Sequence, residues 1–264
     1  MEEFKVEIIG RDGREDGAAT LTVEVPLTIE VNGRELATLL CSPTDLTDLV
    51  IGFLYTTGMI NNVAAINKLL VDEERWKAQL EIAEEGLPEE LIFKRIYTSG
   101  CGKGVVFHNP FDLIQRIRMQ NGPAMGSERI NELMKGFLNY STEYRNTRGV
   151  HSAALAGDGG IEIFRDDVGR HNAIDKVIGQ ALQRETKLND KIMLTSGRIS
   201  SEIISKLMRS RIPLVASSGA PTNQAVKMAR EINLTVLGFV RSSRMHIFSG
   251  GERVLSQRST INDQ

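Results

Sequence analysis

The 264-residue chain has few cysteines: only Cys41 and Cys101 are present. Two cysteines are too few for a disulfide scaffold or a cysteine-based zinc site. No segment approaches the roughly 18 apolar residues that a membrane span needs. The first residues, MEEFKVEIIGRDGRED, lack the apolar core and small-residue cleavage site of a secretory signal. We therefore expect a cytoplasmic protein that does not enter a membrane and whose thiols are kept reduced.

The chain also lacks a charge excess of either sign. It has 32 Lys and Arg against 34 Asp and Glu, a net charge of −2. That balance argues against a non-specific nucleic-acid binder. A hydrophobic share of 41% and a charged share of 25% are ordinary for a globular protein. The length allows one large domain or two smaller ones.

The first half of the chain has the pattern of a small α+β domain. Two alternating strands are predicted in LTVEVPLTIEVNGREL, with a turn at Asn32-Gly33. After Cys41-Ser42-Pro43 we predict a helix that Thr44 caps and Gly58 ends. Residues 68–97 favour further strands. We assign residues 1–122 to this N-terminal domain.

The second half, residues 123–264, has a different rhythm. A helix with apolar residues at 130, 133, 134, 137 and 138 precedes a predicted hairpin, HSAALAGDGGIEIF. A helix, HNAIDKVIGQALQRE, follows the hairpin. Strands and helices then alternate through KIMLTSG, RISSEIISKLMRS, IPLVASSG, PTNQAVKMAREI and NLTVLGFV. This alternation predicts an α/β fold with a mostly parallel sheet covered by helices.

Cys101 lies in a glycine-rich loop, TSGCGKG. The glycines leave room for a partner to approach the sulfur, and Lys103 and Arg95 would stabilise the thiolate. A thiolate is the species that attacks a sulfur donor. The residues alone allow a nucleophile, a redox sensor or a sulfur carrier. We interpret Cys41, between ATLL and Ser-Pro, as a packed structural residue.

A second group of reactive residue types lies in FRDDVGRHNAIDKVIG. Gly169 ends a strand and a helix starts near His171, at the kind of junction where open α/β sheets bind ligands. Asp166, Asp167 and Arg170 are therefore candidate site residues. Alternatively, Asp167 and Arg170 pair with each other and only join the loop to the helix.

FRDDVGRHNAIDKVIG resembles the signature of the formate dehydrogenase accessory sulfurtransferase family, FdhD/NarQ. The likeness continues in order through VNGRELATLLCSPTDLTDLVIGFLYTTGMI, TSGCG, LTSGRISSEII, IPLVASSGAPTNQAV and NLTVLGFVRSSR. The resemblance implies a sulfurtransferase in which Cys101 accepts persulfide sulfur from a cysteine desulfurase. It further implies that the sulfur passes to the molybdenum bis-molybdopterin guanine dinucleotide cofactor for a formate dehydrogenase, and that the protein is a homodimer.

The chain departs from the family pattern at the carrier loop. The family has Cys-x-x-Cys there; Cys101 matches the first cysteine, but Gly104 stands at the second. One sulfur atom still suffices to carry one persulfide. The substitution keeps open a cofactor-binding chaperone that does not transfer sulfur. Asp166 stands where the signature more often has glutamate.

The resemblance also implies that the C-terminal domain is a cytidine-deaminase-like three-layer domain with a mixed sheet. Zinc deaminases need His-x-Glu and Pro-Cys-x-x-Cys to activate water. Here His151 is followed by Ser152 and Ala153, and no Pro-Cys-x-x-Cys occurs. We therefore expect no zinc and no deamination, and we interpret His151 as a core histidine.

Three loops that follow predicted strands are candidates for holding the cofactor. Two are rich in serine and glycine, at 195–198 and 217–219. The third matches the family's cofactor-contacting stretch. By resemblance the cofactor contacts are Phe239, Val240, Arg241, Ser242, Ser243 and Arg244. Arg241 and Arg244 would face its phosphates.

Overall fold

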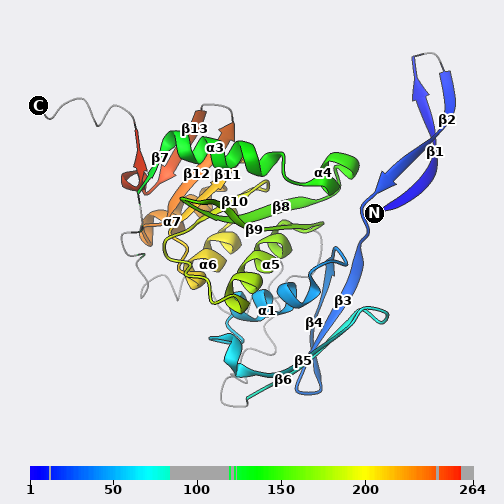
Figure 1. Ribbon diagram of the computed structural model, residues 1–264, viewed down its shortest axis with the longest axis horizontal. Coiled ribbons are helices and arrows are strands. Elements are labelled where there is room, and N and C mark those ends of the chain that lie inside the picture. Colours follow the sequence, from blue (N-terminus) through cyan, green and yellow to red (C-terminus); the bar gives the residue numbers. More distant parts are fainter. Residues whose placement is uncertain (12, 84–118, 120–121, 123, 242–243, 257–264) are drawn as a thin grey trace, which may run out of the picture.

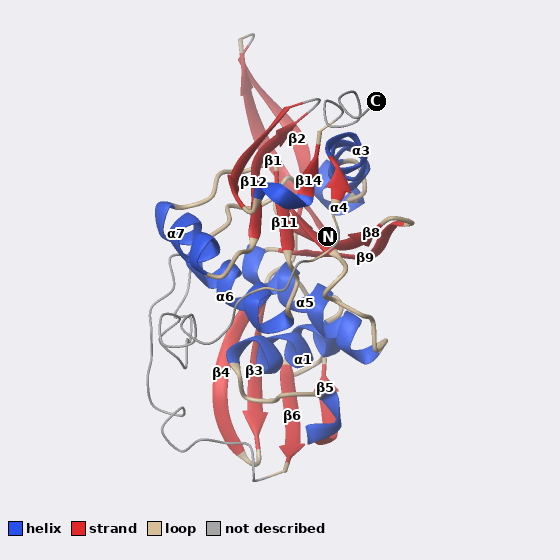
Figure 2. Cartoon of the chain, turned by 90° about the vertical axis from the view of Figure 1, so that its left-hand side faces the viewer, coloured by secondary structure: helices blue, strands red, loops and turns tan. Residues whose placement is uncertain are grey.

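The computed structural model describes residues 1–11, 13–83, 119, 122, 124–241 and 244–256 (Figure 1). Two sheets and a set of helices between them make up the body (Figure 2). A separate two-stranded hairpin projects from it (Figure 1). Within the described part of the chain, no helix combines the length and apolar character needed to cross a membrane.

The N-terminal sheet has the order β4-β3-β6-β5. Its strands are β3 (Val25–Val31), β4 (Arg34–Cys41), β5 (Ile66–Asp72) and β6 (Lys77–Ile82). The predicted turn between β3 and β4 is confirmed, since Asn32 and Gly33 both adopt positive φ, 49° and 76°. Alternate residues of β3 are buried, so one face of the sheet is apolar. That face packs against α1 (Leu46–Thr57).

The ends of α1 only partly follow the prediction. Gly58 ends the helix with φ 89°, as expected. Thr44 does not cap it: Asp45 is the N-cap residue, in a left-handed conformation and without a side-chain capping bond. The Asp45 carboxylate instead lies 3.4 Å from Arg165. Tertiary contacts therefore replace the local cap.

The C-terminal part is built on a six-stranded sheet of order β13-β12-β11-β10-β8-β9. The strands are β8 (His151–Gly157), β9 (Gly160–Asp167), β10 (Ile192–Thr195), β11 (Leu214–Ser217), β12 (Thr235–Arg241) and β13 (Arg244–Ser249). The strands β10, β11 and β12 are parallel, and the other three pair antiparallel. The predicted mixed sheet and the β8–β9 hairpin are confirmed. The expectation of a mostly parallel sheet is wrong: three of the five strand pairs are antiparallel, because β8–β9 and β12–β13 are hairpins and β8 runs opposite to β10.

Helices cover both faces of this sheet. On one face lie α5 (Arg170–Gln183), α6 (Ser201–Ser210) and α7 (Asn223–Glu231). On the other lies α3 (Ser127–Leu138), which buries Ile130, Leu133, Met134 and Phe137. The exposed Leu138 is the one predicted apolar position that the core omits. The three layers are confirmed, while the likeness to cytidine deaminases stays a prediction.

The two parts meet where α1 crosses α5. Gly52 and Gly179 lie at this crossing: a Cβ on Gly52 would come within 1.8 Å of the Asp175 carbonyl oxygen, and one on Gly179 within 1.9 Å of the Asp48 carbonyl oxygen. Only glycine permits so close an approach of two backbones. The layers therefore stack as α3, six-stranded sheet, α5–α7, α1 and four-stranded sheet (Figure 2).

The remaining elements are short or peripheral. They are β1 (Glu2–Gly10), β2 (Gly13–Leu21), η1 (Val63–Ala65), β7 (Met125–Gly126), α4 (Thr142–Thr147), η4 (Gly251–Arg253) and β14 (Val254–Leu255). Strands β7 and β14 pair in parallel. The described residues neither support nor oppose a domain boundary at residue 122, which stays a prediction.

Candidate functional site

Several strand ends meet at one edge of the six-stranded sheet. Because β10, β11 and β12 are parallel, their carboxyl ends lie side by side. Strand β8 runs the other way and pairs Ala153 with Thr195, so its first residue, His151, lies at the same edge. The helices α5 and α6 begin there as well, after β9 and β10. Ligands bind at such an edge in open α/β sheets.

The loops at this edge are joined by hydrogen bonds. The Ser152 amide donates to Ser196 Oγ at 3.0 Å, and the Ser196 amide donates to the Ser152 carbonyl oxygen at 3.0 Å. Ser217 Oγ donates to the Gly197 carbonyl oxygen at 2.6 Å, and the Phe239 amide to the Gly219 carbonyl oxygen at 3.0 Å. The predicted serine-glycine loops thus form one continuous, preorganised rim.

A pocket of about 390 Å³ opens on this rim. Its walls come from the end of α3, from α4 and the residues after it, and from the strand ends. The lining residues are Phe137, Leu138, Ser141, Tyr144, Arg148, Gly149, Val150, His151, Ser152, Val168, Ser196, Ser218 and Arg241. The volume lies within the roughly 300–1,000 Å³ of small-molecule sites.

The pocket combines two guanidinium groups with aromatic and hydroxyl side chains. The Arg148 guanidinium carbon lies 5.0 Å from the centre of the Tyr144 ring, in cation–π contact. Burial, and secondarily the charge of Arg170, lowers the pKa of His151, so its ring is neutral near pH 7. Two cations beside a neutral imidazole and serine hydroxyls suit a phosphate-bearing ligand.

The predicted cofactor stretch places only some of its side chains at the pocket. Arg241 lines it. Val240 is fully buried against the α3 side of the core, so its side chain cannot reach a ligand. Phe239 is half-exposed, with φ 53° and its ring 5.2 Å from that of His246. Arg244 is exposed, and its backbone lies opposite that of Arg241 in the register of the β12–β13 hairpin.

Two further residues of that stretch, Ser242 and Ser243, lie outside the described residues. Cys101 and its loop lie outside them as well. Their assigned roles stay predictions. Cys41 is fully buried, and burial raises the pKa of its thiol to about 12. The interpretation of Cys41 as a structural cysteine is confirmed, because such a thiol is not a nucleophile at neutral pH.

Asp166, in the signature segment, hydrogen-bonds to residues that line the pocket. Asp166 accepts hydrogen bonds from Ser141 Oγ at 2.6 Å and from Ser152 Oγ at 2.5 Å, two hydroxyls of the pocket lining. Burial raises the pKa of Asp166. Since both its oxygens are engaged with lining residues, Asp166 positions the pocket wall.

Asp167 is not a ligand-facing residue. It is fully buried and lies 2.7 Å from Lys176 Nζ, which is also fully buried. It also accepts from the Ser42 amide at 3.0 Å and the Gly169 amide at 2.8 Å. Lys176, six residues further along α5 than Arg170, is thus an ion-pair partner of Asp167. The pairing of Asp167 with Arg170 stays a prediction. The Arg170 side chain packs over Gly197 at the rim.

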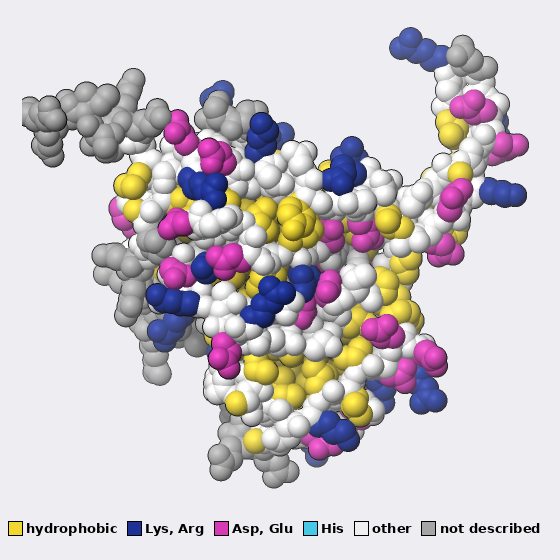
Figure 3. Space-filling view, viewed as in Figure 1, with side chains coloured by type: hydrophobic (Ala, Val, Ile, Leu, Met, Phe, Trp, Pro, Cys, Tyr) yellow, Lys and Arg dark blue, Asp and Glu magenta, His cyan; other side chains and the backbone are white. Residues whose placement is uncertain are grey.

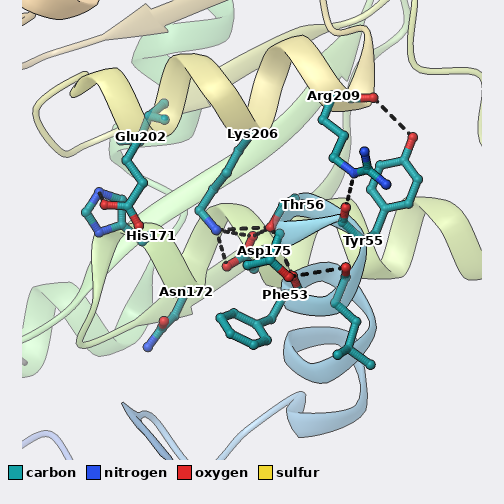
Figure 4. Close-up of polar contacts among 12 residues, drawn as sticks. Phe53, Tyr55, Thr56, His171, Asn172, Asp175, Glu202, Lys206 and Arg209 are labelled. Carbon is teal, nitrogen blue, oxygen red and sulfur yellow. Dashed lines mark hydrogen bonds and ion pairs between the residues drawn. The ribbon is translucent and has the colours of Figure 1, made fainter. Parts of the chain in front are cut away.

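A second polar cluster joins α1, α5 and α6 (Figure 4). Lys206 Nζ lies 2.9 Å and 2.7 Å from the two carboxylate oxygens of Asp175, and Thr56 Oγ1 donates to Asp175 at 2.7 Å. His171 Nε2 lies 3.2 Å from Ser200 Oγ and 3.4 Å from Glu202. Burial first, then the charge of Lys206, lowers the pKa of His171 to about 3. This cluster lies within the helical layer.

Sequence reasoning missed most of the pocket lining, and four of the missed residues are instructive. Tyr144 and Arg148 belong to a short polar segment without apolar periodicity, so no signal marked them. His151 lines the pocket, which the core interpretation did not foresee. Leu138 was assigned to the core, but it lines the pocket rim. Among the described residues, no group of three or more His, Cys, Asp and Glu is arranged to hold a metal ion.

The geometry defines a class of protein: a mixed-sheet α/β protein with a cation-lined pocket at the ends of its strands. The sequence profile of the FdhD/NarQ family matches residues 22–255. The chain therefore belongs to the FdhD/NarQ family.

Relatives of nearly full length agree with this assignment. The sulfur carrier protein FdhD of Halalkalibacterium halodurans is 39% identical over 254 residues, covering 94% of this chain and 92% of that protein. The protein of the same name from Geobacillus kaustophilus is 36% identical over 236 residues, covering 89% of this chain and 90% of that protein. A crystal structure assigned as a formate dehydrogenase accessory protein from Desulfotalea psychrophila has a TM-score of 0.79 at 24% identity. The match covers 96% of this chain and 99% of that chain. That last likeness establishes the shared fold.

Proposed function

We propose that this protein is a sulfur carrier that serves formate dehydrogenase. Cys101 accepts sulfur from a cysteine desulfurase as a persulfide and delivers it to the molybdenum bis-molybdopterin guanine dinucleotide cofactor. The observation that carries this proposal is family membership over residues 22–255, with relatives named sulfur carrier protein FdhD at 36% and 39% identity. We place the reaction in the cytoplasm and include a homodimer in the proposal.

The first step is an exchange at sulfur. The Cys101 thiolate attacks the outer sulfur of the desulfurase persulfide; one S–S bond forms as the other breaks, and the desulfurase cysteine leaves as its thiolate. Cys41 cannot substitute, since it is fully buried and its thiol pKa is raised to about 12. The carrier chemistry therefore rests on one sulfur atom.

The pocket at the sheet edge is the proposed place for the acceptor. Arg148 and Arg241 offer charge-assisted hydrogen bonds to phosphate, and Tyr144 offers a ring face to a flat heterocycle. A volume of about 390 Å³ suits one nucleotide portion of so large a molecule. We propose that one guanine nucleotide half of the cofactor binds here.

Mass spectrometry tests the sulfur step. After incubation with a cysteine desulfurase and cysteine, the wild-type protein should gain one sulfur atom, about 32 Da. Cys101→Ala should gain none and should fail to support active formate dehydrogenase. The matched control, Cys41→Ala, should still gain sulfur. Sulfur on the Cys101→Ala protein, or full dehydrogenase activity with it, would refute the carrier role.

Guanosine diphosphate binding tests the pocket. Loss of one charge-assisted hydrogen bond costs about 1.5–3 kcal/mol, so Arg241→Ala should weaken binding about 10- to 100-fold. The control is Arg184→Ala, which changes an exposed arginine at the far end of α5. Equal affinities of the two variants would place the nucleotide elsewhere.

The second candidate is a cofactor-binding chaperone without sulfur transfer, which Gly104 favours. Both candidates predict nucleotide binding that depends on Arg241. Only the carrier predicts sulfur on Cys101. A protein that binds nucleotide but never gains sulfur in the mass spectrum would support the chaperone.

A further inference from the structure

Two serine hydroxyls at the sheet-edge pocket have protons that are already committed. Ser152 Oγ donates to one oxygen of Asp166 at 2.5 Å, and Ser141 Oγ donates to the other at 2.6 Å. An ionised carboxylate only accepts hydrogen bonds, and a serine hydroxyl has a single proton. Each hydroxyl therefore turns its proton toward Asp166 and offers a ligand only the lone pairs of its oxygen.

Strand register holds the contact between Ser152 and Asp166 in place. The two residues lie directly opposite each other in the β8–β9 hairpin. Opposed residues of an antiparallel pair project from the same face of the sheet. Ala154, two residues further along β8, packs on the α3 side of the sheet. Ser152 and Asp166 therefore project toward α3 and α4, the side from which Ser141 and Tyr144 line the pocket.

The two serines differ in the acceptor capacity that remains. Ser141 Oγ is the N-cap of α4 and also accepts from the Tyr144 amide at 2.8 Å. Within the described part of the chain, Ser152 Oγ makes no hydrogen bond besides the one to Asp166. Ser152 is buried and lines the pocket. Its oxygen is therefore suited to an N–H group of a ligand, whereas an acceptor atom of a ligand would meet its lone pairs.

The two pocket cations complement this acceptor. The guanidinium groups of Arg148 and Arg241 donate hydrogen bonds and cannot accept them. Arg148 is the C-cap residue of α4, and Figure 3 shows Lys and Arg side chains gathered over this helix. A ligand that satisfies the whole pocket carries an anionic group at the guanidinium groups and an N–H donor at Ser152. Guanosine diphosphate has both, since its diphosphate is anionic and guanine carries a 2-amino group.

We propose that Ser152 determines base specificity by accepting a hydrogen bond from the 2-amino group of guanine, and that Asp166 is the positioning residue that orients the Ser152 hydroxyl. This role rests on the proposed binding of a guanine nucleotide at the pocket, and it names the side chain that recognises the base. Inosine diphosphate differs from guanosine diphosphate only in lacking the 2-amino group. It would therefore leave the buried Ser152 oxygen without a ligand partner.

Isothermal titration calorimetry of the full-length protein with the two nucleotides tests the role of Ser152. The wild type should bind guanosine diphosphate about 5- to 20-fold more tightly than inosine diphosphate, the effect of one hydrogen bond to a buried acceptor. Ser152→Ala should weaken guanosine diphosphate to the affinity of inosine diphosphate and leave inosine diphosphate within about twofold. The control is Ser210→Ala, which changes a buried serine at the far end of α6 and should keep the wild-type preference.

Two substitutions of Asp166 test its positioning role in the same titrations. Ser152 has more free lone pairs than Ser141, so in Asp166→Asn the amide N–H should donate to Ser152 and turn its hydroxyl proton into the pocket. The preference for guanosine over inosine diphosphate should then fall below about twofold. Asp166→Glu retains the carboxylate and should keep the preference. A purely structural role of Asp166 would weaken both nucleotides equally and leave their ratio unchanged.

Circular dichroism checks that each variant is folded. Equal binding of the two nucleotides by the wild type overturns the role of Ser152, and so does an unchanged preference in Ser152→Ala. If guanosine diphosphate still binds in an Arg241-dependent way, the proposed nucleotide site stands and only base recognition by Ser152 fails. If guanosine diphosphate does not bind at all, both fail. Pterin carries the same amino group without a phosphate, and tighter binding of pterin would overturn the assignment to guanine.

Discussion

Replacing Gly179 by alanine tests whether the two parts of the protein are joined through backbone contact. A Cβ on Gly179 would lie 1.9 Å from the Asp48 carbonyl oxygen and 2.8 Å from the Gly52 amide nitrogen. Both neighbours are backbone atoms and cannot rotate away, so α1 and α5 must separate by more than about 1 Å to restore van der Waals contact. Such overpacking costs about 1–3 kcal/mol or more.

The separation would also strain polar contacts that span the crossing. Arg165 Nη2 lies 2.7 Å from Asp48, and Thr56 lies 2.7 Å from Asp175. Alanine gains about 1 kcal/mol over glycine in helix propensity, which offsets part of the loss. With the strained polar contacts included, the expected net destabilisation is about 1–2 kcal/mol, or a melting temperature about 2–8 °C lower.

Thermal denaturation followed by circular dichroism measures this effect. Gly136→Ala is the matched control, because this glycine lies in α3 and an added Cβ would meet no atom within 4 Å. It keeps the propensity gain and should raise the melting temperature slightly. A Gly179→Ala protein as stable as the wild type, or equal losses in both variants, would show that the crossing is not tight.

Two further predictions concern buried charges. Lys176→Met leaves Asp167 buried without the lysine of its ion pair, so it should lower the free energy of unfolding, measured by urea denaturation, by about 3–5 kcal/mol. The control Lys191→Met breaks a more exposed ion pair and should lower the free energy of unfolding by less than about 1 kcal/mol. His171 has a pKa of about 3 in the folded protein, against an ordinary 6.5, so the unfolded chain binds the proton first and stability falls as the pH drops below 6.5. Between pH 7 and pH 5 the free energy of unfolding should fall by about 2 kcal/mol because of His171. His171→Gln should remove this pH dependence, and the exposed control His246→Gln should retain it. An unchanged pH dependence in His171→Gln would contradict the assignment.

The elements that the sequence predicted correctly have local signals. Asn32-Gly33 specifies a turn with positive φ, Gly58 ends a helix, and Asp158-Gly159 joins two strands. The alternation of strands and helices in the second half likewise depends on short-range periodicity. These features require no knowledge of distant residues.

The features that sequence reasoning missed depend on contacts between distant segments. Gly52 and Gly179 each lie in an ordinary helical pattern, and only their mutual approach shows why both lack a side chain. The hairpin formed by β1 and β2 was not predicted, although its alternating Phe4, Val6 and Ile8 carry a period-two signal among charged residues. Arg148 entered the site through tertiary structure alone.

The signature segment shows why charged residues were hard to interpret from sequence. Its charges are typical of a ligand site, but most of them bind other parts of the chain: Arg165 contacts Asp48 of α1, Asp167 contacts Lys176, and Asp175 contacts Lys206. Each contact fixes α5 or the strand before it against a neighbouring element. The segment thus holds the N-terminal sheet, the helical layer and the pocket wall in one arrangement.

This arrangement separates two tasks along the chain. The signature residues position the wall, since Asp166 holds the hydroxyls of Ser141 and Ser152 at the pocket. The cations that face the pocket, Arg148 and Arg241, come from segments before β8 and at the end of β12. Because positioning and ligand contact lie on different segments, substitutions in the signature should alter stability as well as binding, whereas substitutions of Arg148 or Arg241 should alter binding alone.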